Sequence, residues 1–166
     1  MRIQWRRPMS NTPANVQNYK SKTLATWVTL IGGPLGLHRF YLHGFGDWWG
    51  WLHPIPTLLG VLGLQRVEEI GQDDKLAWLL IPILGFMVAY TMLQAIYYGL
   101  MADEKWHARF NPALREDPNA PASGWAAVVA VVLALLLGAT VLMATIAFSG
   151  QRYFEYQVDE ALKISQ

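Results

Sequence analysis

Residues 125–148 read WAAVVAVVLALLLGATVLMATIAF, a run of 24 residues without one charged side chain. About 20 apolar residues are enough for a helix to cross the hydrocarbon core of a bilayer. A single segment in lipid satisfies its backbone hydrogen bonds by becoming helical. The stretch therefore predicts a transmembrane helix, and it places the chain among the all-α integral membrane proteins.

Three further segments extend this pattern toward the N-terminus. Residues 76–101 form a second uncharged run, of 26 residues. Residues 24–42 would measure about 28 Å as a helix, enough to span if Arg39 extends its charge to the far interface. Residues 48–64 are short and contain two prolines, which predicts either a short span or a re-entrant segment. We expect a bundle of about four transmembrane helices, the second of them short and broken by proline.

Composition agrees with this class and excludes others. Of the 166 residues, 53% are hydrophobic and 15% are charged, which is too apolar for an ordinary soluble domain of this size. The 13 basic and 12 acidic residues nearly cancel, so the net charge does not indicate a nucleic-acid partner. The sequence contains no cysteine, which excludes disulfides and thiolate chemistry.

The positions of Lys and Arg predict the orientation. Residues 1–22 contain five basic and no acidic residues, which is typical of a cytoplasmic segment. With four spans, nine basic residues face the cytoplasm and four face outside; with 48–64 re-entrant, the division becomes eight to five. The larger asymmetry favours four spans in a bacterial inner membrane, with both termini cytoplasmic and residues 102–124 as a short outer loop.

These expectations divide the chain into four parts. They are a basic cytoplasmic segment (1–22), a first helix pair (23–70), a second helix pair (71–150) and an amphipathic tail (151–166). Apolar side chains of the tail recur at i, i+4, i+7 and i+8, namely Phe154, Val158, Ala161 and Leu162. The tail is slightly acidic, which favours a protein partner or the bundle's own edge over anionic lipid.

The stretch 20–44, KSKTLATWVTLIGGPLGLHRFYLHG, runs from a basic cluster through a glycine-rich apolar segment to a Gly-x-His-Arg-Phe-Tyr-Leu signature that begins at Gly36. This order resembles the opening of the two-transmembrane (TM-two) domain family, and the resemblance covers roughly residues 20–70. It implies a membrane-embedded helix pair that is used in many contexts, and it implies no particular reaction.

The signature holds the most unusual polar cluster, His38, Arg39, Phe40 and Tyr41. An arginine beside hydrocarbon is costly unless it pairs or reaches the interface. We therefore expect an interfacial anchor in which Arg39 pairs with Asp47 or with a lipid phosphate; a functional polar site is the alternative. The histidines lack the spacing of a metal site, so we expect no metal, no cofactor and no catalytic residue.

Small residues recur at four-residue spacing along several segments. Such spacing lets helix backbones approach closely in lipid, where no hydrophobic effect drives association. The residues are Ala126, Ala130, Ala134 and Gly138 in the last long segment, Gly32 with Gly36 in the first, and Gly85 with Ala89 in the third. They predict packing within the bundle or, alternatively, a docking face for another subunit.

Together these features favour a small non-enzymatic membrane protein, a structural or accessory subunit of a larger membrane complex. Its expected partners are membrane lipids and either a membrane protein or further copies of itself. A transporter or channel for a small solute is the alternative, because transporters build binding sites from broken helices. A transporter should bring polar groups of broken helices together at mid-membrane, whereas a subunit should turn a smooth face outward.

Overall fold

The computed structural model describes residues 19–117 and 119–165, and every regular element among them is a helix. The all-α prediction is therefore confirmed for this part of the chain; residues 1–18, most of the predicted basic segment, lie outside it. The elements are α1 (Lys22–Gly32), the 3-10 helix η2 (Gly33–Leu35), α2 (Leu37–His43), α3 (Trp48–Leu52), α4 (Pro54–Ile70), α5 (Lys75–Leu100), α6 (Asp103–Phe110), the 3-10 helix η3 (Pro112–Leu114) and α7 (Trp125–Ile164).

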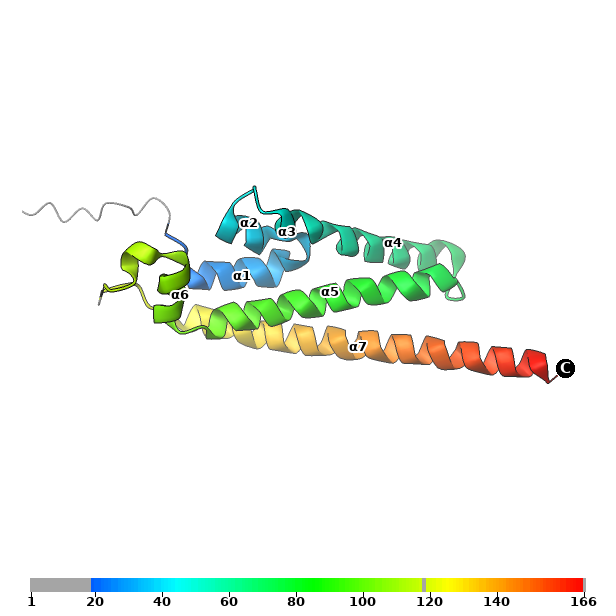
Figure 1. Cartoon of the computed structure of the whole chain (residues 1–166). Coiled ribbons are helices and arrows are strands. Elements are labelled where there is room, and N and C mark those ends of the chain that lie inside the picture. The colour runs from blue at the N-terminus through cyan, green and yellow to red at the C-terminus, as the bar shows by residue number, and fades with distance from the viewer. Residues whose placement is uncertain (1–18, 118, 166) are drawn as a thin grey trace, which may run out of the picture.

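Helices α5 and α7 form a long antiparallel pair on which the other helices pack (Figure 1). Their register shows in three close approaches between a glycine of one helix and a side chain of the other: Gly85 with Thr145, Gly138 with Met92, and Gly99 with Val131. Ala89, one turn from Gly85, is half-buried. Among the described helices, these two are long and apolar enough to cross a membrane, where the sequence predicts about four spans.

The middle of the small-residue stripe of α7 faces the interior of the bundle. Ala130 and Ala134 are fully buried in a cluster with residues of α1 and α5. Ala126 is exposed, and Ala127 is buried in its place. The stripe therefore packs within the bundle, which leaves it unavailable as an outward docking face.

The first apolar segment is not a single span. Helix α1 stops at Gly32, and after η2 the chain folds back as α2, so the segment forms a helical hairpin (Figure 1). Tyr41 returns to the start of α1, where its hydroxyl accepts a hydrogen bond from the Ser21 amide at 2.8 Å. Its carbonyl accepts another from Lys20 Nζ at 2.7 Å. The prediction of a straight span over 24–42 is therefore wrong.

Proline and glycine account for this reversal. Pro34 has no amide to donate, and its ring clashes with the carbonyl four residues earlier in a continuing helix. Gly36 has a φ of 76°, a left-handed conformation that glycine adopts without steric cost. A Cβ at Gly36 would also meet the Gly50 carbonyl, and one at Gly32 would meet the Leu37 side chain. Gly32 and Gly36, which the sequence predicts as a helix-packing pair, thus allow the chain to reverse within the hairpin.

The second segment is broken at proline, as predicted. Helix α3 ends at Leu52 and α4 begins at Pro54, which is tolerated at a first helical position because no intrahelical bond is lost there. Helix α4 continues to Ile70 and lies against α5, with Gly60 directly on the α5 backbone. Its helical part is therefore longer than the predicted 48–64.

The two ends of the bundle differ from the predicted sides. One end, which we call the capped end, contains the start of α1, the connection 44–47, α6 and the described residues that follow it, 111–117 and 119–124. At the other, the tail end, lie the connection 71–74 and the projecting last turns of α7 (Figure 1). The sequence predicts residues 102–124 on the opposite side of the membrane from the start of α1, whereas in the structure the described part of this connection lies at the same end of the bundle as the start of α1, because the first segment forms a hairpin. Lys20 and Ile164 consequently lie at opposite ends, not together.

Candidate functional site

A pair of buried histidines lies inside the bundle where both broken segments meet. His38 in the first turn of α2 is 0% exposed, and His53 at the junction of α3 and α4 is 6% exposed. Their ring centroids are 5.3 Å apart in an edge-to-face arrangement. Gly50 allows this proximity, because a Cβ there would collide with the Phe40 ring of α2. The turn that reverses the hairpin therefore also brings the two imidazoles together.

Gln94 of α5 lies beside His38 and completes what we call the histidine cluster, His38, His53 and Gln94. One ring nitrogen of His53, Nδ1, lies 2.7 Å from the Trp49 carbonyl. Both nitrogens of His38, Nε2 of His53 and the amide oxygen of Gln94 are buried without a well-oriented hydrogen bond to another described residue, although Gln94 lies close enough to interact with the His38 ring. A buried unpaired polar group costs about 1–3 kcal/mol, which makes the cluster a candidate site for a hydrogen-bonding ligand.

The cluster can bind a hydrogen-bonding group or a proton, because imidazole offers both a donor and an acceptor nitrogen. Two tyrosines lie next to it: the His38 ring lies 6.1 Å from that of Tyr98, and the His53 ring 6.2 Å from that of Tyr90. Within residues 19–117 and 119–165, no three His, Cys, Asp or Glu side chains gather closely enough to hold a metal ion.

Sequence reasoning missed this pair. His38 and His53 are 15 positions apart, so helical spacing does not connect them, and His53 stands alone in the sequence. The available signal was that each histidine lies next to a helix break, His38 two residues after Gly36 and His53 directly before Pro54. Broken helices place their end residues toward the bundle interior in membrane proteins.

Arg39 pairs with Asp47 and not with a residue of the histidine cluster. Its Nε donates to Asp47 Oδ2 at 2.6 Å and its Nη2 to Oδ1 at 3.2 Å, a bidentate contact. The hydrogen bond from Arg39 lowers the pKa of the Asp47 carboxyl. Phe40 stacks on Phe45 and Trp51, with centroids 5.4 and 5.0 Å apart. The four consecutive signature residues thus take four different roles, and only His38 enters the buried site.

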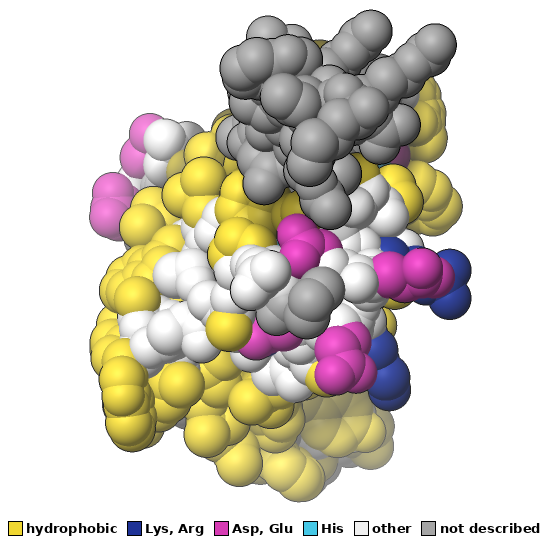
Figure 2. Space-filling model, turned by 90° about the vertical axis from the view of Figure 1, so that its left-hand side faces the viewer, with side chains coloured by type: hydrophobic (Ala, Val, Ile, Leu, Met, Phe, Trp, Pro, Cys, Tyr) yellow, Lys and Arg dark blue, Asp and Glu magenta, His cyan; other side chains and the backbone are white. Residues whose placement is uncertain are grey.

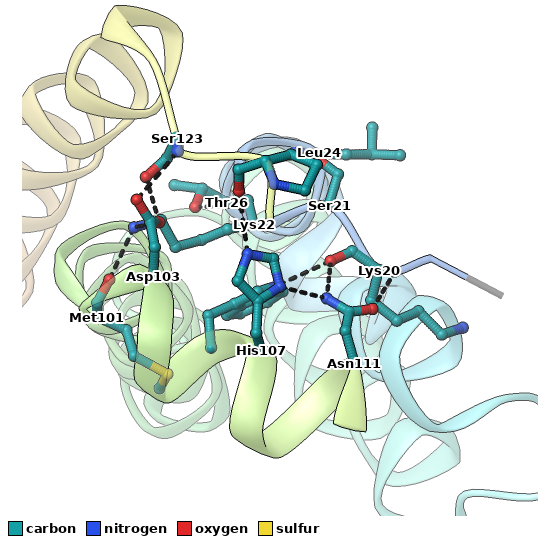
Figure 3. A network of polar contacts seen from close by, with 12 residues as sticks. Lys20, Ser21, Lys22, Leu24, Thr26, Met101, Asp103, His107, Asn111 and Ser123 are labelled. Carbon is teal, nitrogen blue, oxygen red and sulfur yellow. Dashed lines mark hydrogen bonds and ion pairs between the residues drawn. The ribbon is translucent and has the colours of Figure 1, made fainter. Parts of the chain in front are cut away.

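A second polar network closes the capped end (Figure 3). Lys22, 7% exposed, donates to the Met101 carbonyl at 2.7 Å and pairs with Asp103 at 2.6 Å. Asp103 also accepts from the amide and hydroxyl of Ser123. Burial opposes ionisation, but these hydrogen bonds from Lys22 and Ser123 lower the pKa of Asp103. The network ties the start of α1 to both ends of the 101–124 connection.

Asn111 and His107 extend this network. The Asn111 side chain exchanges two hydrogen bonds with the Lys20 backbone, at 2.7 and 3.0 Å, and lies 3.2 Å from His107 Nδ1. Trp106 is 1% exposed and donates to the Lys20 carbonyl. Figure 2 looks onto this end, where polar and acidic groups lie among large apolar flanks. All these contacts are internal, so we interpret the network as structural.

Comparison with known proteins adds no identification: no family model, no curated protein and no solved structure matches this chain. The TM-two resemblance of residues 20–70 therefore stays a prediction, and the case for function rests on the chain's own geometry.

Proposed function

We propose that this protein is a small, non-enzymatic integral membrane protein that acts as an accessory subunit. In this proposal α3 with α4, α5 and α7 each cross the bilayer, and α1 with α2 form a hairpin that enters and leaves on the capped side. Large apolar side chains along the long helices support it, among them Leu58, Leu79, Leu93, Leu136 and Met143, which are 60–65% exposed. A surface of that kind is expected to face lipid or another apolar surface.

Charge supports a cytoplasmic position for the capped end. Six described basic residues lie there against five acidic ones, and Arg2, Arg6 and Arg7 precede them in the chain. The basic residues are Lys20, Lys22, Arg39, Lys105, Arg109 and Arg115. The tail end has four basic and seven acidic residues, the basic ones being Arg66, Lys75, Arg152 and Lys163. Because loops rich in Lys and Arg stay in the cytoplasm, α7 is proposed to end on the outer side.

The observation that carries the accessory function is the projecting tail of α7. Lys75 of α5 reaches the Tyr156 ring, with Nζ 4.9 Å from its centroid. Beyond that point Val158 and Leu162, one turn apart on one face, remain 58% and 56% exposed. The edge of the bundle, one of the two predicted occupants of this face, therefore does not cover it. A slightly acidic helix with an uncovered apolar face fits a protein partner.

Replacing Val158 and Leu162 together with serine is expected to release the partner while leaving the bundle intact. The change removes the apolar contact at the centre of the proposed interface, for which we expect about a tenfold or greater loss of retained partner. The measurement is mass spectrometry of the full-length protein and its associated chains after gentle detergent extraction from membranes.

The matched control is the double change Tyr153→Ser and Ile164→Ser, two exposed apolar residues on roughly the opposite side of the helix, 60% and 85% exposed. Retention in the control with loss in the Val158/Leu162 variant supports the tail as the docking element. Equal retention of the partner in both variants would contradict this role of the tail. So would a wild-type protein that is extracted from the membrane with no associated chain.

The histidine cluster supports a second candidate, a transporter or channel for protons or a small polar solute. Its polar groups converge inside the bundle from two broken segments, which is the feature that distinguishes a transporter from a subunit. In vesicles that contain the purified protein and a pH-sensitive dye, a proton gradient should then dissipate faster than in empty vesicles. His38→Asn should abolish the difference, and His43→Asn, at a 40% exposed side chain outside the cluster, should preserve it. Equal rates in protein-containing and empty vesicles would rule out proton conduction.

A further inference from the structure

A groove at the capped end separates the last turn of α5 from α6. It has a volume of ≈ 600 Å³ and is lined by Tyr97, Leu100, Met101, Ala102, Lys105 and Arg109. Ligand sites commonly have volumes of about 300–1,000 Å³. The groove shares no residue with the histidine cluster, and it adjoins the polar network of this end only through Met101, whose carbonyl accepts from Lys22.

One wall of the groove is apolar and continues along a candidate membrane span. Leu100 ends α5 and is 69% exposed, and Tyr97, one turn earlier, is 55% exposed. Helix α5 is apolar enough to lie in hydrocarbon. The wall is therefore continuous with the apolar surface of α5, which is the arrangement expected of a surface that binds an acyl chain.

The opposite rim is cationic. Lys105 and Arg109 are one turn apart on α6, which places them on the same face of that helix. Both are exposed, and neither forms an ion pair with a carboxylate in the described part of the chain. Arg109 Nη1 lies 3.5 Å from the Tyr97 hydroxyl, a long hydrogen bond, and its guanidinium lies 5.3 Å from the centre of the Phe110 ring.

The acidic residues of α6 do not neutralise this rim. Asp103 is occupied by Lys22 and Ser123 on the inner side of the helix. Glu104 lies about 100° around the helix from Lys105 and is not part of the groove lining. The groove thus combines two unneutralised cations with an apolar wall at the end of a span.

We propose that this groove binds one anionic phospholipid, with its phosphate between Lys105 and Arg109 and one acyl chain along Tyr97 and Leu100. Arginine matches phosphate in bidentate fashion, and lysine adds a compact charge. Basic pockets between helices at the cytoplasmic surface are recognised sites for anionic head groups. The proposal rests on the membrane insertion proposed above, and it adds a defined lipid to it.

The test uses the purified full-length protein in mild detergent, titrated with phosphatidylglycerol or with phosphatidylcholine of the same acyl chains, and native mass spectrometry to count bound lipid. We expect one phosphatidylglycerol per chain to be retained in preference to phosphatidylcholine. The double change Lys105→Gln and Arg109→Gln should reduce that binding about 30-fold, the factor that two cationic contacts provide near an anionic lipid surface.

Arg115→Gln with Lys163→Gln is the control, because it removes the same charge from exposed positions outside the groove. Leu100→Gln tests the apolar wall. It should weaken the binding of phosphatidylglycerol, but it should leave the binding of glycerol phosphate, the head group without acyl chains, as weak as it is in the wild type. Equal binding of the two lipids, or unchanged binding in the Lys105/Arg109 variant, would overturn the proposal. A protein that fails to fractionate with membranes would instead refute membrane insertion, so the two failures are distinguishable.

Discussion

Gly36→Val is expected to destabilise the fold more than any other single substitution in the first hairpin. Gly36 has a φ of 76°, a conformation that costs a β-branched residue about 1–3 kcal/mol. Its new Cβ would also collide with the Gly50 carbonyl, a backbone atom that cannot rotate away. Overpacking of this kind adds about 1–3 kcal/mol. The measurement is unfolding of the detergent-solubilised variant, followed by tryptophan fluorescence.

Gly44→Val shows the effect of backbone strain alone. Gly44 has a φ of 84° and a ψ of 174°, a combination that essentially only glycine adopts, but a Cβ added there would have no other atom within 4 Å. We expect Gly36→Val to lower the free energy of unfolding at least as much as Gly44→Val, because the collision with the Gly50 carbonyl adds to its own backbone strain. A clearly smaller loss for Gly36→Val would mean that α3 does not pack on the hairpin turn as described, and the histidine cluster would then lose its structural basis.

The long helices could be predicted from sequence, and the path between them could not. Uncharged runs of sufficient length identify α5 and α7 directly, because lipid admits few alternatives to a helix. Residues 24–42 have a composition that suits both a straight span and a hairpin. Pro34 marked the break, but the contact that decides the direction, Tyr41 with Ser21, joins residues 20 positions apart. One reversal in that segment exchanges the predicted side of every later connection.

The small residues of α7 were likewise predicted correctly only in part. Ala130 and Ala134 are buried as the stripe predicts, but Ala126 is not. A four-residue step advances about 400° around a helix, so each step drifts about 40° from the contact face. Over the three steps from Gly138 to Ala126 the drift is about 120°, which turns Ala126 outward and leaves Ala127 on the inner face. A pattern of small residues at four-residue spacing therefore overestimates the length of the face that packs against another helix.

Contacts between polar residues could be predicted where the residues are close in sequence, and could not where they are far apart. Arg39 and Asp47 are close in sequence and flank a short connection, so their pairing could be predicted, and the structure contains it at 2.6 Å. His38 and His53 meet only because the hairpin and the proline break lie side by side. Gln94 comes from α5, more than 40 positions later. No spacing rule within one helix brings such residues together.

The second large effect expected is an all-or-none difference in labelling across the membrane. The central claim is that residues 102–124 lie on the same side as the start of α1, and that α7 ends on the other. The sequence contains no cysteine, so single cysteines can be introduced one at a time. Suitable positions are Asn119→Cys at the capped end, with Asp73→Cys and Ser165→Cys at the tail end.

Intact cells that produce each variant are treated with a membrane-impermeant thiol reagent, and lysed cells provide the control for reactivity. With the capped end in the cytoplasm, we predict that Asp73→Cys and Ser165→Cys are labelled in intact cells, and that Asn119→Cys is labelled only after lysis. Labelling of Asn119→Cys alone in intact cells would restore four spans with both ends of the chain inside, and it would contradict the hairpin topology.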